Sequence, residues 1–201
     1  MRIIWLVLIS LLCSCIFIGG VHPYIYTERE YHSSVTREIP IWVDRDFGAG
    51  DGVEIFKAIS AWNYVLNGYI HLRVVDMSFD MEVSKIKEQI REGGWLIMKT
   101  NSGNRMIPVA SNSEDRIIGW SDHVGGNRIW LIRDRMFNDD VFGICLHEMG
   151  HLLGSRHVGH RLMDPIYTRD KFSCVDVDSM ESVARYNHLP ADRLNYCVLQ
   201  D

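Results

Sequence analysis

The segment from 141 to 157, VFGICLHEMGHLLGSRH, constrains the fold more than any other part of the chain. Apolar side chains occur on nearly every side of a helix predicted to start near Val141. A helix that is apolar all round is a buried helix. His147, Glu148 and His151 are therefore expected to lie inside or against a core, where polar groups need partners. The chain has to fold around this helix and supply those partners.

The spacing of the histidines indicates a metal site. His147 and His151 are one helical turn apart, so one ion can bind both imidazoles. Gly154 can adopt the left-handed conformation that ends a helix, and the turn would bring His157 back to the same ion. Three neutral nitrogens leave the fourth tetrahedral position open for water, which is the catalytic form of a zinc site. Glu148 lies next to the first ligand, from where its carboxylate can reach that water.

Two other interpretations of the same residues stay open. The histidines could be core residues whose nitrogens are satisfied by hydrogen bonds, without any metal. They could also form a zinc site that only stabilises the fold, although structural sites usually close with a fourth side chain. Glu148 favours catalysis, because a purely structural site has no use for a base beside its first ligand.

A second segment, RLMDPIYT, begins four residues after His157. Together with the pattern H-E-x-x-H-x-x-G-x-x-H it resembles the metzincin metallopeptidases, in which a methionine turn follows the zinc motif. The likeness is greatest to the matrixins, the matrix metalloproteinase family, which carry a similar Met-x-Pro-x-Tyr segment, here Met163, Pro165 and Tyr167. Val158 departs from the serine that matrixins usually have after the third histidine, and no cysteine-switch prodomain is recognisable.

The resemblance implies a role for each matching residue of a zinc-dependent endopeptidase. It implies three zinc ligands and one general base, namely His147, His151, His157 and Glu148. Met163 would form the apolar floor beneath the metal, and Pro165 and Tyr167 the wall of the pocket for the residue after the scissile bond. The strand near 117–121 would hold an extended substrate.

The resemblance also implies an α+β fold, with a twisted, mostly parallel sheet, two long helices, the methionine turn and a C-terminal helix. Alternating and β-branched residues predict strands at 38–44, 70–76, 95–100, 116–121 and 128–133. Apolar residues at helical spacing predict helices at 53–68, at 80–92 and from 141. Asn138, Asp139 and Asp140 offer N-cap oxygens for the last of these. The segment DVDSMESVARYN resembles the closing helix of the family, with Asp176 or Asp178 as its N-cap.

The N-terminal segment predicts export. Residues 3–18 are apolar, a run longer than the core of a signal peptide and shorter than a typical membrane span. Residues 1–20 are therefore a cleaved signal or a short anchor, or else a buried internal helix, and LCSC also resembles a lipoprotein cleavage box with Cys15 as the lipidated residue. We interpret 21–37 as a tether and 38–201 as one catalytic domain, secreted or membrane-tethered.

Three cysteines lie outside the N-terminal segment, and this odd count leaves at least one thiol unpaired. Cys174 and Cys197 flank the predicted C-terminal helix, so a disulfide between them could fasten the tail of an exported protein. Cys145 is on roughly the opposite side of its helix from His147. We interpret Cys145 as a buried apolar residue rather than a ligand.

Charge and composition limit the other functions. The formal net charge of -5 is spread along the chain, without the basic patch that nucleic-acid binding requires. We expect a monomer that binds zinc and takes a protein or peptide substrate in an extended form. The competing hypothesis is a membrane-tethered binding or structural protein with an inactive zinc site. The two hypotheses differ in whether Glu148 serves hydrolysis.

Overall fold

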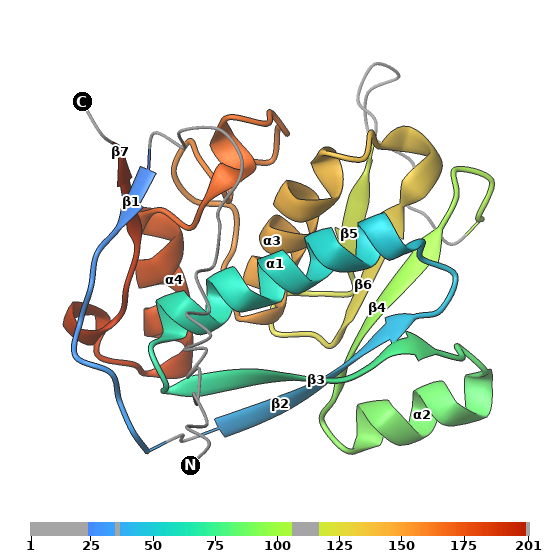
Figure 1. Cartoon of the computed structure of the whole chain (residues 1–201), viewed down its shortest axis with the longest axis horizontal. Helices are drawn as coiled ribbons and strands as arrows, with labels where there is room; N and C mark the ends of the chain where they lie inside the picture. The colour runs from blue at the N-terminus through green and yellow to red at the C-terminus, as the bar shows by residue number, and fades with distance from the viewer. Residues whose placement is uncertain (1–23, 35–36, 106–116, 200–201) are drawn as a thin grey trace, which may run out of the picture.

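The computed structural model of the chain describes residues 24–34, 37–105 and 117–199 (Figure 1). The α-helices in these ranges are α1 (Ala49–Leu66), α2 (Val83–Arg91), α3 (Asp140–Leu152) and α4 (Val177–Asn187). Short 3-10 helices cover Arg133–Arg135, Lys171–Ser173 and Ala191–Arg193. Each predicted helix is present, with ends shifted by a few residues.

The main sheet has the strand order β3-β2-β4-β6-β5. Its strands are β2 (Arg37–Asp44), β3 (Ile70–Phe79), β4 (Trp95–Thr100), β5 (Gly119–Ser121) and β6 (Arg128–Ile132). The first four strands in this order pair in parallel, and β5 pairs antiparallel to β6. The predicted α+β class with a mostly parallel sheet is therefore confirmed, and β5 forms one edge of the sheet.

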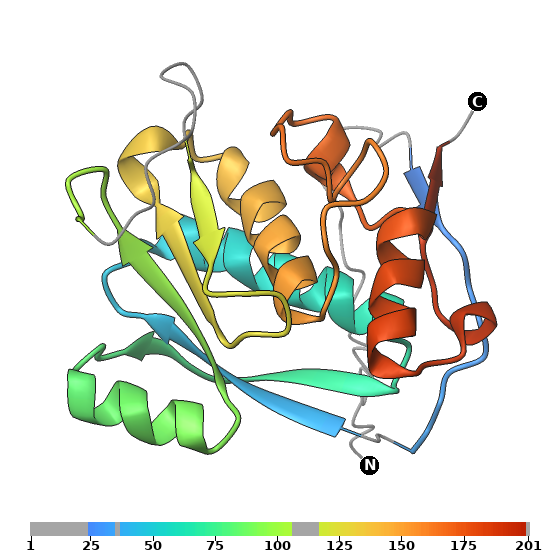
Figure 2. The ribbon, with the colours of Figure 1, turned by 180° about the vertical axis from the view of Figure 1, so that it is seen from behind.

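Helices cover the two faces of the sheet unequally. The long helices α1 and α3 lie across one face, and α2 lies on the other (Figure 1, Figure 2). The indole N–H of Trp62 in α1 donates to the carbonyl of Leu146 in α3 at 2.9 Å, which fixes the two helices to each other. On the opposite face, Ile86 and Ile90 of α2 pack with Trp42 of the sheet. The main hydrophobic core thus lies between the sheet and α3, the helix that carries the histidines.

Helix α1 begins earlier than the glycine-rich segment at its start had led us to predict. It starts at Ala49 instead of residue 53, within the segment FGAGDG that we predicted to be a loop. Asp51 lies in the first turn, where a carboxylate complements the helix dipole. It also accepts from Nε of Arg133 at 3.0 Å. This ion pair, formed with a residue far along the chain, stabilises the glycine-rich first turn.

The predicted N-cap of α3 is wrong. No side chain among Asn138, Asp139 and Asp140 caps the helix. The carboxylate of Asp140 instead accepts from the backbone N–H of Phe137 and from the hydroxyl of Tyr167, each at 2.8 Å. At the C-terminal helix the prediction holds, because Asp176 caps α4 by accepting from the N–H of Ser179 at 3.1 Å.

The segment after residue 23 differs from the tether that we expected for 21–37. Its first residues form β1 (Tyr24–Tyr26), which pairs antiparallel with β7 (Cys197–Leu199) near the C-terminus. Two buried asparagines form hydrogen bonds with the residues that follow β1. Asn195 accepts from the N–H of Arg29 at 2.9 Å, and Asn67 donates to the carbonyl of Glu30 at 2.9 Å. Residues 24–32 therefore belong to the folded domain, and the tether prediction is wrong for them.

Removing this segment should destabilise the domain. A chain that starts at residue 34 loses partners for the buried amides of Asn67 and Asn195, and an unsatisfied buried polar group costs about 1–3 kcal/mol. We expect a melting temperature roughly 4–20 °C below that of a chain that starts at Tyr24. Thermal unfolding followed by circular dichroism compares the two chains. Equal melting temperatures would show that residues 24–33 act as a tether after all.

None of the helices in the described ranges has the length and apolar character needed to cross a membrane. The segment 1–20 that we interpret as a signal or anchor, with Cys15, lies outside the described residues.

Candidate metal centre and active site

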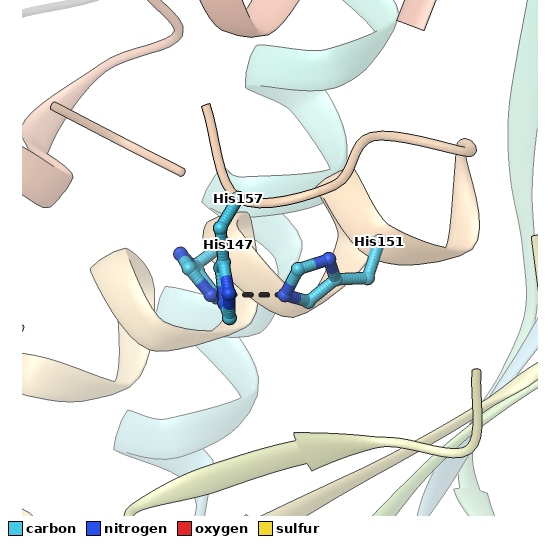
Figure 3. Close-up of side chains that lie close together, drawn as sticks. All are labelled: His147, His151 and His157. Carbon is cyan, nitrogen blue, oxygen red and sulfur yellow. Dashed lines mark hydrogen bonds between the residues drawn. The ribbon is translucent and has the colours of Figure 1, made fainter. Parts of the chain in front are cut away.

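The three histidines of the motif converge on one point. His147 and His151 come from successive turns of α3, and His157 comes from the chain that follows the helix (Figure 3). The nitrogen atoms that they offer all lie within 4.8 Å of one another. In the part of the chain that the structure describes, no other group of histidines, cysteines and carboxylates gathers in this way. The structure therefore brings together the ligand set that the spacing predicted.

Backbone carbonyls orient the two helical histidines. Nδ1 of His147 lies 2.5 Å from the carbonyl oxygen of Leu162, and Nδ1 of His151 lies 2.8 Å from that of Ser155. A carbonyl oxygen only accepts, so each Nδ1 carries the proton and each Nε2 carries a lone pair. The two Nε2 atoms face each other at 3.1 Å (Figure 3). Two lone pairs held this close favour a shared cation.

Zinc fits this donor set. Zn–N bonds of about 2.0–2.1 Å in a tetrahedron require nitrogens about 3.3–3.4 Å apart. The Nε2 atoms of His147 and His151 lie 3.1 Å apart, and all three ligand nitrogens lie within 4.8 Å of one another. Burial, together with a smaller effect of neighbouring His151, lowers the pKa of His147 to about 3. Burial also lowers the pKa of His151 and of His157. The imidazoles are therefore neutral at pH 7, which is the form that binds a metal.

The turn after α3 depends on Gly154. This residue has a φ of +96°, in the left-handed region, as the sequence predicted. A Cβ at this position would lie 2.0 Å from ring carbons of Tyr186 in α4, so space as well as backbone conformation demands glycine. Its N–H donates to the carbonyl of His151 at 2.9 Å, which closes the helix and reverses the chain toward His157.

Met163 lies against the helix of the site, fully buried in the core. A Cβ on Gly150 of α3 would approach its sulfur to 2.5 Å, so the turn packs directly on the helix surface between His147 and His151. The carbonyl of Met163 accepts from the N–H of Val158 at 3.2 Å. The methionine turn therefore supports both the helix and the segment that carries His157.

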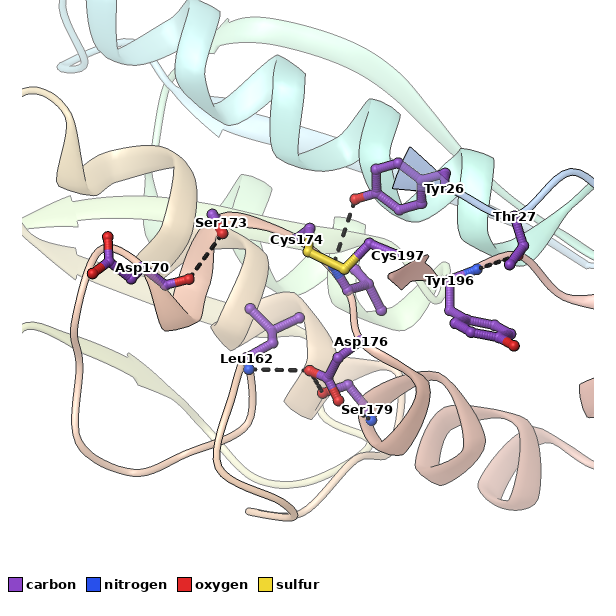
Figure 4. Close-up of a disulfide and its surroundings, with 11 residues drawn as sticks. Tyr26, Thr27, Leu162, Asp170, Ser173, Cys174, Asp176, Ser179, Tyr196 and Cys197 are labelled. Carbon is purple, nitrogen blue, oxygen red and sulfur yellow. Dashed lines mark hydrogen bonds between the residues drawn. A yellow bond between two sulfur atoms is a disulfide. The ribbon is translucent and has the colours of Figure 1, made fainter. Parts of the chain in front are cut away.

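Asp176 links the site to the disulfide, a connection that the sequence did not reveal. Its carboxylate accepts from the N–H of Leu162 at 3.1 Å (Figure 4). The carbonyl of Leu162 in turn accepts from Nδ1 of His147. Asp176 follows closely after Cys174, which forms the expected disulfide with Cys197. The sequence indicated a helix N-cap at Asp176 or Asp178 and no more, because nothing local to Asp176 points toward the histidines.

Tyr167 and Pro165, the predicted pocket wall, have different surroundings. The ring of Tyr167 packs edge-on against that of Phe172, with the ring centroids 4.9 Å apart. The ring of Phe172 in turn stacks on that of His147, with the centroids 4.6 Å apart. Tyr167 also lines a small pocket of about 170 Å³ beside α3, together with Asp139, Phe142, Gly143, Arg169, Phe172 and Ser173. Pro165 is exposed and does not line this pocket. Phe172 therefore separates Tyr167 from His147, and Tyr167 lines this pocket whereas Pro165 does not. The role of both residues in substrate binding stays a prediction.

Glu148 is buried beside the first ligand. Burial raises the pKa of its carboxyl group to about 8, against the opposing effect of hydrogen bonds from Ser121. A cation held by the histidines would favour the charged carboxylate and lower this pKa. A carboxyl group balanced in this way between burial and nearby positive charge suits proton transfer near neutral pH.

The similarity of this chain to known proteins is slight. No model of a protein family matches the sequence, and no curated protein matches it. A solved structure of metalloproteinase-II from Bacteroides fragilis matches with 18% identity and a TM-score of 0.49. The match covers 78% of this chain and 55% of that protein, so the chain spans little more than half of its length. A likeness at this level does not assign a family or an activity, which have to be argued from the site.

Proposed function

We propose that this chain is a zinc-dependent endopeptidase of metzincin type. The observation that carries the proposal is the convergence of three imidazoles, with the buried carboxyl group of Glu148 on the residue that follows the first of them. Three histidines leave one position of a tetrahedral zinc ion open, which is the arrangement of catalytic sites. The metzincin-like sequence from 144 to 168 supports the same class of enzyme.

The side chains divide the chemistry between them. His147, His151 and His157 would hold the ion through their unprotonated nitrogens. When bound, zinc activates a water molecule and polarises the peptide carbonyl. The carboxylate of Glu148 accepts a proton from the attacking water and donates it to the nitrogen of the leaving amine. The hydrogen bonds from His147 and His151 to backbone carbonyls keep the ligand nitrogens in place during these transfers.

The sheet edge beside the site suits an extended peptide. β5 is the edge strand next to β6, and its residue Ser121 contacts Glu148. A peptide can add to such an edge as a further strand, with backbone hydrogen bonds giving affinity and pockets giving selectivity. We therefore propose that a protein or peptide substrate lies along β5 with its scissile bond at Glu148.

We also propose that the domain acts outside the cytoplasm as a monomer. The disulfide between Cys174 and Cys197 supports this location, because such bonds persist in oxidising compartments. The apolar residues 3–18 supply the matching export signal or anchor in the sequence.

Cleavage should favour an apolar residue directly after the scissile bond. The small pocket beside α3 is lined by the rings of Phe142, Tyr167 and Phe172, with Asp139 and Arg169 also in its lining, and Phe172 stacks on His147. Burial of an apolar side chain gives about 1.5–3 kcal/mol, so the preference should be roughly 10- to 100-fold. Mass spectrometry of a digested peptide library tests both this preference and the proposed cleavage of internal bonds. A profile dominated by acidic or basic residues at this position would contradict the pocket assignment.

A further inference from the structure

The edge strand β5 directs alternate backbone groups toward the open side of the sheet. The carbonyl of Ile118 accepts from the N–H of Ile132 at 2.9 Å, and the N–H of Asp122 donates to the carbonyl of Arg128 at 3.1 Å. Backbone groups in an antiparallel pair alternate between the partner strand and the opposite side. The N–H of Ser121 therefore points away from β6, toward the edge where a substrate strand would add.

The same alternation directs side chains to the two faces of the sheet. Trp120 stacks on Trp130 with ring centroids 4.5 Å apart, while the residues on either side of it face α3. A Cβ on Gly119 would lie 2.6 Å from the side chain of Ile144 and 2.8 Å from Oε1 of Glu148. The strand thus approaches the carboxylate closely enough that only glycine fits at position 119.

Ser121 makes two hydrogen bonds to Glu148. Its hydroxyl and its backbone N–H both donate to the carboxylate. Ser121 and Glu148 are both buried, with 9% and 6% of their surface exposed, so water competes little for these bonds. The edge-facing N–H of Ser121 is therefore already used by the protein and is not available to a substrate.

We infer that Ser121 is a positioning residue that holds the carboxylate of Glu148 on the edge strand, with Gly119 providing the space for it. The inference rests on the proposed function, because it assigns Ser121 a role in placing the base. A glutamate side chain has several rotatable bonds, and two donors on a rigid strand restrict it to one orientation. The strand that would bind the substrate then also places the base. The position of the Glu148 carboxylate relative to the scissile bond is therefore fixed by β5.

Kinetics of three serine variants test the positioning role. Ser121→Ala removes one of the two donors, and we expect kcat to fall about tenfold while KM and zinc content stay unchanged. Ser121→Thr keeps the hydroxyl and should recover most of the loss. Ser78→Ala is a matched control, because the hydroxyl and N–H of Ser78 likewise both donate to a carboxylate, that of Asp76, on the opposite edge strand β3. It should leave kcat unchanged.

Amide exchange gives a second readout that does not depend on hydrolysis. In the zinc-loaded wild type, the hydrogen bond to Glu148 should slow exchange of the edge-facing amide of Ser121 about tenfold. Glu148→Ala should remove this protection of Ser121. The exchange is measured by nuclear magnetic resonance on the full domain from Tyr24.

The outcomes separate this inference from the proposed function. Unchanged kcat in Ser121→Ala, or an equally fast Ser121 amide in wild type and Glu148→Ala, would overturn the role of Ser121 even in an active peptidase. A wild type that hydrolyses no peptide would instead contradict the proposed function, while the exchange comparison would still decide whether Ser121 holds Glu148.

Discussion

Replacing Glu148 with glutamine should leave zinc binding intact and lower kcat/KM by about 10²- to 10⁴-fold. Glutamine has nearly the same shape, and its carbonyl oxygen can still accept a hydrogen bond from Ser121. It cannot take a proton from water at neutral pH or return one to the leaving amine. Metal analysis and hydrolysis of a fluorogenic peptide, both on the purified domain, measure the two properties separately.

A matched variant separates loss of the base from loss of any glutamate charge. Glu181→Gln changes an exposed glutamate on α4 and should keep full activity. The melting temperatures of both variants should stay within a few degrees of the wild type. If Glu148→Gln hydrolyses peptides as fast as the wild type, Glu148 is not the base.

Replacing His151 with alanine should abolish both zinc binding and hydrolysis. Two remaining imidazoles hold an ion poorly, and His151 is the ligand whose Nε2 lies 3.1 Å from that of His147. Zinc present at about 1,000 times its Kd adds about 4 kcal/mol to the free energy of unfolding of a protein that binds it only when folded. For a domain of this size that corresponds to a rise in melting temperature of roughly 8–16 °C. The variant should show no such rise when zinc is added.

The exposed His160 provides the control for this experiment. It lies three residues after His157 but is not part of the converging group. His160→Ala should keep one equivalent of zinc, the zinc-dependent rise in melting temperature and full activity. Retention of a full equivalent of zinc by His151→Ala would show that the ligand assignment is wrong.

Local patterns predicted the convergence of the three histidines because the geometry that produces it is local. Two histidines one helical turn apart share a face, and Gly154 reverses the chain within a few residues, so the spacing alone brings His157 back. The strands and helices of the core were predictable for the same reason, since alternation and helical spacing depend only on near neighbours. The cysteine pair was found because its members flank a single helix.

Long-range contacts explain what the sequence did not predict. The polar segment 24–32 has little pattern of its own, and it is ordered by Asn67 and Asn195, side chains distant in the sequence. Asp140 does not cap α3 because Tyr167 and Arg169, more than twenty residues later, bind its carboxylate. The contact of Ser121 with Glu148 joins a sheet edge to a helix, and no spacing rule connects the two.

Chelator-dependent hydrolysis tests the central claim most directly. The wild-type domain is incubated with a peptide library before treatment with a chelator, after treatment, and after one equivalent of zinc is returned. We predict cleavage of internal peptide bonds in the first state, none in the second and recovery in the third, with Glu148→Gln inactive throughout. A wild type that binds one equivalent of zinc and cleaves no peptide in any state would contradict the peptidase assignment and favour a structural zinc site.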